Sequence, residues 1–172
     1  MTKYEPWKEE PSGKEYSYMI RASTRSRQSF MKRNFEFPDT GYIEAQEDKT
    51  GIFMERPRMY KPGLYGYVHG WGSYHTPFTM YYAIGSMIWQ LAVVKNDEVI
   101  FNREDGDRSC RVPRLWIKKT GEAEEIQTLL RNEGTPYASL VADNFAEQHS
   151  FWTVAMEKTF AMRSAVRGKV LA

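Results

Sequence analysis

Cysteine is almost absent from this 172-residue chain, in which Cys110 is the only one. A single cysteine excludes an internal disulfide framework and any metal cluster built from several cysteines of this chain. The sequence also lacks HExxH, GxGxxG and the P-loop pattern, although glycines stand at positions 63, 66, 70 and 72. It therefore has no motif for zinc-dependent hydrolysis, dinucleotide binding or nucleotide hydrolysis.

A strong excess of charge of one sign is missing too, because 24 basic and 22 acidic residues leave a net charge of +2. This composition gives no electrostatic argument for a nucleic-acid-binding protein. The most basic cluster lies within residues 21–33. It predicts either a solvated, salt-bridged face or a contact with phosphate, from anionic lipid or from nucleic acid. Its members are Arg21, Arg25, Arg27, Lys32 and Arg33.

Charge is absent altogether from residues 62–94, a run of 33 residues in a chain in which 27% of residues are charged. The second part of this run, residues 77–94, is predominantly apolar. As a helix it would be about 27 Å long, close to a bilayer core of about 30 Å. Thr76 and Pro77 suit the start of such a helix. We therefore predict a single transmembrane helix at 77–94.

The competing interpretation of this run is a buried helix or strand pair in a soluble domain. Gln90 lies in its middle, and Thr79, Gly85 and Ser86 dilute its hydrophobicity. In the membrane interpretation, these small and polar residues form a face against other transmembrane helices, where close approach and amide hydrogen bonds are possible.

The other segments complete a prediction of a mainly α protein, because few of them show the alternation of a strand. Residues 1–15 are expected to form an extended arm with Tyr4 and Trp7 as anchors. Residues 16–76 are expected to be an irregular region that ends in an interfacial loop, with one short hairpin near residues 48–51. Residues 95–172 form a C-terminal helical lobe in this prediction.

Two helices are predicted in this C-terminal lobe. The first begins at Thr120 or Gly121, with an acidic first turn, and Gly134 ends it. The second begins at Thr135 and Pro136 and runs to about residue 166 as a long amphipathic helix. We expect its apolar face to pack against another subunit; the residues on this face are Phe145, Trp152, Met156 and Phe160.

These features favour a non-catalytic, single-pass accessory subunit of a large membrane complex. A respiratory-chain or related energy-converting assembly of the mitochondrial inner membrane fits best. The expected partners are other subunits of the complex and the bilayer, including anionic lipid, but not nucleic acid. Two basic residues precede the predicted span and five follow it within about 20 residues, which favours the C-terminal lobe on the matrix or cytoplasmic side.

Two other functions remain open. One is a soluble α+β protein, for example a viral one, that binds protein or nucleic acid through residues 21–33. The other follows from Tyr18-Met-Ile-Arg-Ala-Ser-Thr-Arg25, which resembles the first strand of ADP-ribosyltransferase toxins, where an arginine holds the dinucleotide. That resemblance covers about a dozen residues and implies that Glu122 and Glu124 are the carboxylate pair, but the Ser-Thr-Ser strand of the family is missing.

No catalytic, cofactor-binding or metal site is predicted from the sequence. His69, His75 and His149 are the only histidines, and their spacing matches no metal-binding pattern. Hydrogen bonding at an interface is the role that we expect for them.

Overall fold

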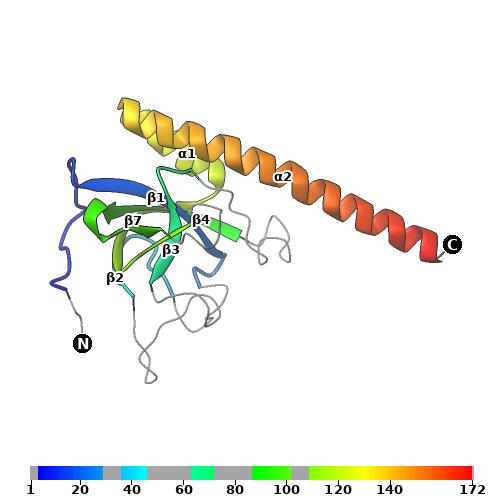
Figure 1. Ribbon diagram of the computed structural model, residues 1–172, viewed down its shortest axis with the longest axis horizontal. Coiled ribbons are helices and arrows are strands. Elements are labelled where there is room, and N and C mark those ends of the chain that lie inside the picture. Colours follow the sequence, from blue (N-terminus) through cyan, green and yellow to red (C-terminus); the bar gives the residue numbers. More distant parts are fainter. Residues whose placement is uncertain (1–3, 29–35, 46–62, 72–86, 102–108, 172) are drawn as a thin grey trace, which may run out of the picture.

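In the computed structural model, residues 4–28, 36–45, 63–71, 87–101 and 109–171 are described. They form a seven-stranded antiparallel sheet with two helices (Figure 1). The strand order across the sheet is β2-β7-β4-β1-β3-β6-β5. The strands are β1 (Tyr16–Thr24), β2 (Gly41–Glu44), β3 (Leu64–Val68), β4 (Met87–Lys95), β5 (Ile100–Phe101), β6 (Cys110–Val112) and β7 (Arg114–Gly121), and the helices are α1 (Ala123–Glu133) and α2 (Pro136–Leu171).

The prediction of a mainly α protein with a transmembrane helix at 77–94 was wrong. Residues 77–86 lie outside the described residues, and residues 87–94 belong to β4, which pairs with β1 on one side and β7 on the other. No helix among the described residues is both long enough and apolar enough to cross a membrane. The single-pass interpretation and the inner-membrane location, with its orientation, depended on that helix and fall with it.

Burial on both faces explains why β4 has the composition of a membrane segment. Trp89, Leu91 and Val93 face a core beneath the helices, whereas Ala92 and Val94 face a second core on the opposite side of the sheet. A strand buried on both faces excludes charge from every position, so it is read as a continuous apolar run instead of an alternating one.

Strands also occupy regions that were expected to be irregular. The strands β1, β2 and β3 all lie within residues 16–76, the predicted irregular region. Residues 99–114, which were predicted to belong to the C-terminal helical lobe, contain β5, β6 and the start of β7. The hairpin predicted near 48–51 falls outside the described residues.

Two helices lie in the predicted C-terminal region, and the end of the first and the start of the second were predicted correctly because their end signals are local. The first helix begins at Ala123 instead of at Thr120 or Gly121, which belong to β7, and the prediction that the second helix is amphipathic was wrong. Glu122 forms a capping box with Glu125 at the start of α1, and Gly134 ends α1 in the left-handed conformation with φ of 77°. At the start of α2, the Thr135 hydroxyl accepts a hydrogen bond from the amide of Ala138 at 3.1 Å. The second helix runs beyond the predicted end at about residue 166 to Leu171.

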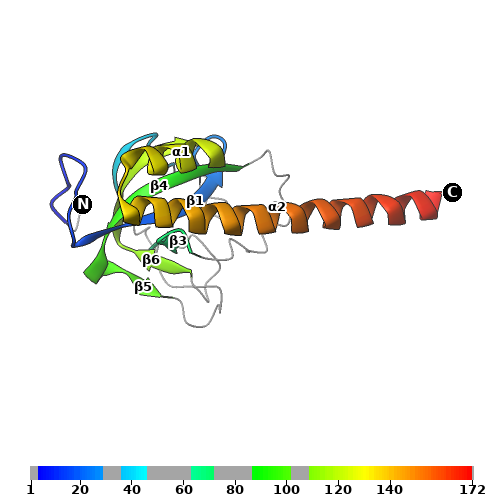
Figure 2. The same ribbon diagram turned by 90° about the horizontal axis from the view of Figure 1, so that it is seen from above.

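The first half of α2 packs on the domain. Ala138, Val141, Ala142 and Phe145 are fully buried in the core beneath the helices. Figures 1 and 2 show α1 and the start of α2 side by side on one face of the sheet, with the C-terminal half of α2 continuing past the domain. We call residues 136–150 the docked half of α2 and residues 151–171 the projecting half.

The close contact between the paired strands β1 and β3 allows a test of this sheet. A Cβ atom at Gly66 would lie 2.6 Å from the side chain of Met19 and 3.0 Å from the carbonyl oxygen of Ile20. Because the backbone of Ile20 cannot move aside easily, we expect Gly66→Ala to lower the free energy of unfolding by about 1 to 3 kcal/mol, as measured by urea denaturation. In a double-mutant cycle, Met19→Ala should partly relieve this loss. Additive effects of the two changes would contradict the contact.

Candidate protein-binding surface

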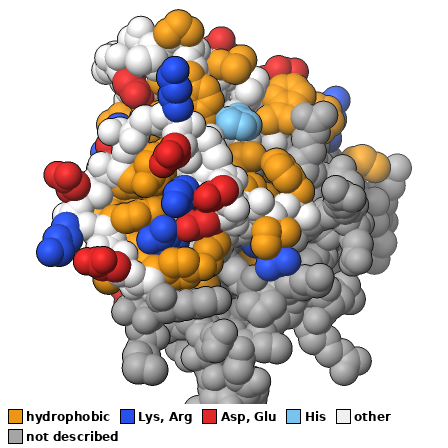
Figure 3. Space-filling model, turned by 60° about the vertical axis from the view of Figure 1, so that its left-hand side comes forward, with side chains coloured by type: hydrophobic (Ala, Val, Ile, Leu, Met, Phe, Trp, Pro, Cys, Tyr) orange, Lys and Arg blue, Asp and Glu red, His pale blue; other side chains and the backbone are white. Residues whose placement is uncertain are grey.

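The basic cluster predicted at residues 21–33 does not form a single positive surface. Arg25 pairs with Glu122 at 2.7 Å, and Arg27 lies 3.7 Å from Glu36. Arg21 is buried, and Lys32 and Arg33 lie outside the described residues. The ion pairs of Arg25 and Arg27 give no support to phosphate binding through the cluster. Acidic and basic side chains also lie next to one another among hydrophobic ones on the face of the molecule shown in Figure 3.

Arg21 serves the interior of the domain. Its side chain is 2% exposed, donates hydrogen bonds to the backbone oxygen of Tyr65 at 2.7 Å and to Oε1 of Gln90 at 3.1 Å, and lies 3.9 Å from the centre of the Phe37 ring. Through these contacts the guanidinium, which belongs to β1, is linked to β3, to β4 and to the segment that contains Phe37. It has no exposed surface with which to hold a dinucleotide.

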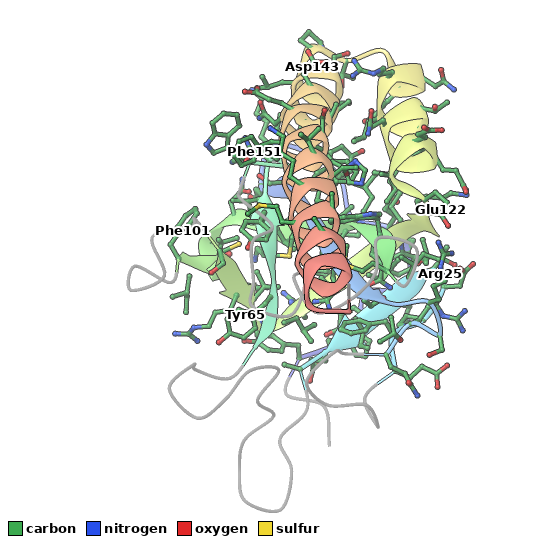
Figure 4. The ribbon with its side chains drawn as sticks, turned by 90° about the vertical axis from the view of Figure 1, so that its right-hand side faces the viewer. Arg25, Tyr65, Phe101, Glu122, Asp143 and Phe151 are labelled. Carbon is green, nitrogen blue, oxygen red and sulfur yellow. The ribbon has the colours of Figure 1, made fainter. Side chains whose placement is uncertain are left out.

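The other residues of the ADP-ribosyltransferase resemblance are also engaged in the fold. Residues 18–24 of that segment do lie in β1, but Glu122 caps α1 and pairs with Arg25 (Figure 4). Glu124 lies in the first turn of α1, where a carboxylate stabilises the positive end of a helix. The geometry therefore assigns Glu122 and Glu124 to helix stabilisation.

A group of polar side chains joins β1 and β7 to the helices. The Tyr18 hydroxyl donates a hydrogen bond to Glu133 at 2.7 Å and accepts one from Lys118 at 3.2 Å. The Tyr18 ring stacks on Tyr137 with 5.8 Å between ring centres. Burial, followed by the bond to Glu133, raises the pKa of Tyr18 to about 12. The hydroxyl thus stays protonated at neutral pH and acts as a fixed link in the fold.

The histidines make contacts within the chain. Nδ1 of His69 lies 2.8 Å from the hydroxyl of Tyr137, and His149 packs edge-on against Trp89 and Phe145. His75 lies outside the described residues. Among the residues that the structure describes, no group of three or more His, Cys, Asp or Glu side chains is placed to hold a metal ion.

Large apolar side chains are exposed along α2. Leu140 is 53% exposed, Phe151 63%, Val154 46% and Met162 69%. At 100° per residue, these four positions fall within about 80° of arc on the helix surface. Phe151 lies on the side of α2 away from α1 (Figure 4). The exposed apolar residues therefore share one face, which runs from the docked half into the projecting half.

This face has a regular spacing of four and three residues in turn, as in the contact seam of packed helices. All of its members are exposed except Asn144, which is partly buried. Its central residues are apolar, and one acidic and one basic residue flank them. We call these residues the exposed stripe: Leu140, Asn144, Glu147, Phe151, Val154, Lys158, Ala161 and Ala165.

The exposed stripe differs from the face that the sequence predicted for contact with another subunit. Phe145, expected at that interface, is buried within its own domain, and the side chains of Trp152, Met156 and Phe160 are not described. Apolar residues occur all around α2, so periodicity did not separate the exposed face from the buried one. The four-three spacing of the stripe was the sequence signal that could have indicated the exposed face. It identifies that face only when the residues buried against the domain are known.

Comparisons of this chain with protein-family models, with curated proteins and with solved structures found no match. The arrangement of residues on α2 is therefore the basis for any functional proposal.

His149 makes the junction between the two halves of α2 sensitive to acid. Burial lowers the pKa of His149, and the charge of Glu124 opposes this shift. A lowered pKa in the folded state stabilises the fold above the unfolded pKa of about 6.5, and this contribution is lost as pH falls through the folded value. We expect His149→Phe, which keeps an aromatic ring against Trp89, to reduce the loss of stability between about pH 7.5 and about pH 5.

Urea denaturation at both pH values measures this effect. Burial also lowers the pKa of His69, so His69→Gln is the control that separates the two histidines. If the pH dependence in the His149→Phe variant equals that of the wild type, the lowered pKa of His149 is refuted.

Proposed function

We propose that this protein is a non-catalytic binding module that holds another protein chain against the exposed stripe of α2. The observation that carries this proposal is the exposure, on the projecting half, of Phe151 and Val154 of the stripe, at 63% and 46%, and of Met162 beside the stripe, at 69%. These side chains lie on one face of a regular helix. Contiguous exposed apolar residues of this kind mark interaction surfaces.

The stability of the projecting half supports the same proposal. Most helices in proteins are stabilised by tertiary packing of an apolar face more than by their own propensity. The docked half obtains this packing from Val141 and Phe145, which are fully buried. Burying the exposed surface of Val154 and Met162 against another chain would add such packing to the projecting half.

A binding role also replaces the membrane-complex function, which the sheet contradicts. A binding role agrees with the alternative hypothesis from the sequence, an α+β protein that binds another protein or nucleic acid. The mode of binding differs from that alternative, because the contact surface that we propose lies on α2 and not on residues 21–33. Helix-in-groove and helix-on-helix recognition both use apolar anchors with this spacing.

Site-specific photo-crosslinking in the cells of origin tests this proposal. A photoreactive phenylalanine analogue is introduced at Phe151, at Met162 or, as the control, at Glu9 on the N-terminal arm. Residue 9 is exposed, and the arm lies on the opposite side of the sheet from the projecting half (Figure 1). We expect discrete adducts with a single protein at positions 151 and 162 and none at position 9.

Affinity for the chain found in the adduct is then measured with purified proteins. Phe151→Asp should weaken binding by about 2 kcal/mol, or about 30-fold, because it removes an apolar anchor from the centre of the contact. Glu9→Lys should leave the affinity unchanged. The absence of adducts at both positions, or equal affinities for Phe151→Asp and wild type, would refute the binding function.

A further inference from the structure

We propose that the chain bound by the exposed stripe is a second copy of this protein, held antiparallel through α2. This inference rests on the function proposed above, which it makes specific by naming the bound chain. The evidence lies in the order of residues along the stripe and in the distribution of charge along the helix.

The order of residues makes the stripe complementary to itself. The spacing of the stripe alternates between four and three residues and is symmetric about the point between Trp152 and Thr153. When a second copy is placed antiparallel by a two-fold axis at that point, every stripe position of one copy lies opposite a stripe position of the other. In this register, Phe151 of one copy faces the partner's Val154, and both side chains are exposed in the single chain. The axis generates this contact twice, so four apolar side chains meet at the centre.

The flanking positions are also complementary in this register. Glu147 faces the partner's Lys158, and both residues are exposed. Neither forms an ion pair with another described residue of its own chain. A parallel pair would instead place Glu147 against Glu147 and Lys158 against Lys158, and like charges in contact are unfavourable.

Residue size follows the same pattern at the ends of the stripe. Leu140 faces the partner's Ala165, so a large residue of the docked half meets a small residue of the projecting half. Asn144 lies at the position opposite the partner's Ala161, and its side-chain amide donates a hydrogen bond to the backbone oxygen of His69 in its own domain at 3.1 Å. Alternation of large and small side chains across a contact lets two helices approach and interdigitate.

Charge along the whole helix favours the same orientation. The docked half carries Asp143 and Glu147, which give a net charge of −2. The projecting half has a net charge of +3, from one acidic and four basic residues, namely Glu157, Lys158, Arg163, Arg167 and Lys169. An antiparallel pair places each negative half beside a positive half, whereas a parallel pair would oppose like halves.

The length of α2 is explained by this arrangement. The helix spans 36 residues, Pro136–Leu171, and its midpoint lies within about one residue of the proposed axis. The projecting half of each copy therefore has the length needed to cover the docked half of the other. Leu140 and Glu147 of the stripe are exposed, whereas Val141 and Phe145 are buried, so cover of these two exposed positions does not compete with the domain core.

Sedimentation velocity on the purified full chain tests the pairing. We expect a species of twice the 20.1 kDa chain mass that dissociates on dilution. Glu147→Lys and Lys158→Glu should each raise the dissociation constant about tenfold, because each places like charges together at two symmetric contacts. The double variant restores opposite charges and should return to within about threefold of wild type.

Matched controls are available on the N-terminal arm, where Glu9→Lys and Lys8→Glu make the same changes of charge at exposed positions. They should leave the dissociation constant unchanged. Additive losses in the Glu147→Lys/Lys158→Glu double variant would overturn the proposed register.

Disulfide formation between chains tests the orientation. Chains with Leu140→Cys are mixed with chains carrying Ala165→Cys and are oxidised; the native Cys110 is fully buried, and wild type controls for it. We expect disulfides between positions 140 and 165 only. Disulfides between two copies of position 140 would show a parallel pair and overturn the proposal.

The outcomes separate this inference from the binding function. A purified chain that stays monomeric at about 100 µM, well above the dissociation constant of a specific pair, overturns the pairing. If positions 151 and 162 still crosslink to a different protein, the binding function stands without it. If neither a dimer nor a specific adduct forms, both proposals fail.

Discussion

Packing of the docked half of α2 on the sheet is the contact on which the other features of this molecule depend. Val141 and Phe145 enter the core beside Trp89 of the interior strand β4. Gly70 brings the end of β3 so close to α2 that a Cβ atom there would lie 2.7 Å from the backbone oxygen of Val141. This close approach fixes the rotation of the helix about its axis. The rotation in turn decides which residues of α2 are exposed.

The same sheet explains the principal error of the sequence interpretation. Charge is excluded from β4 because both of its faces are buried, and a membrane would exclude charge from a helix equally well. Length favoured the helix only because residues 77–86 were joined to the strand. Periodicity cannot separate these cases when nearly every position lacks charge and polar residues follow no period. Pairing with β1 and β7, which no local signal reveals, resolved them.

Signals confined to a few residues were read correctly. Gly134 ends α1 because its φ of 77° suits glycine, and Thr135 caps α2 through its hydroxyl. The exposed stripe was not predicted, since Phe145 and Phe151 look alike in the sequence, yet one is fully buried and the other is 63% exposed. Position relative to the sheet separates them, and this information is not local.

The composition of the stripe bears on how selective its binding can be. Three large apolar residues alone, Leu140, Phe151 and Val154, would bind many apolar surfaces and in either direction. Glu147 and Lys158 replace apolar residues at two positions of the seam, which lowers the apolar area but penalises every register that opposes like charges. Exposed ion pairs contribute little affinity, so their effect lies mainly in orientation. A stripe with this balance favours a reversible contact of defined geometry over a permanent one.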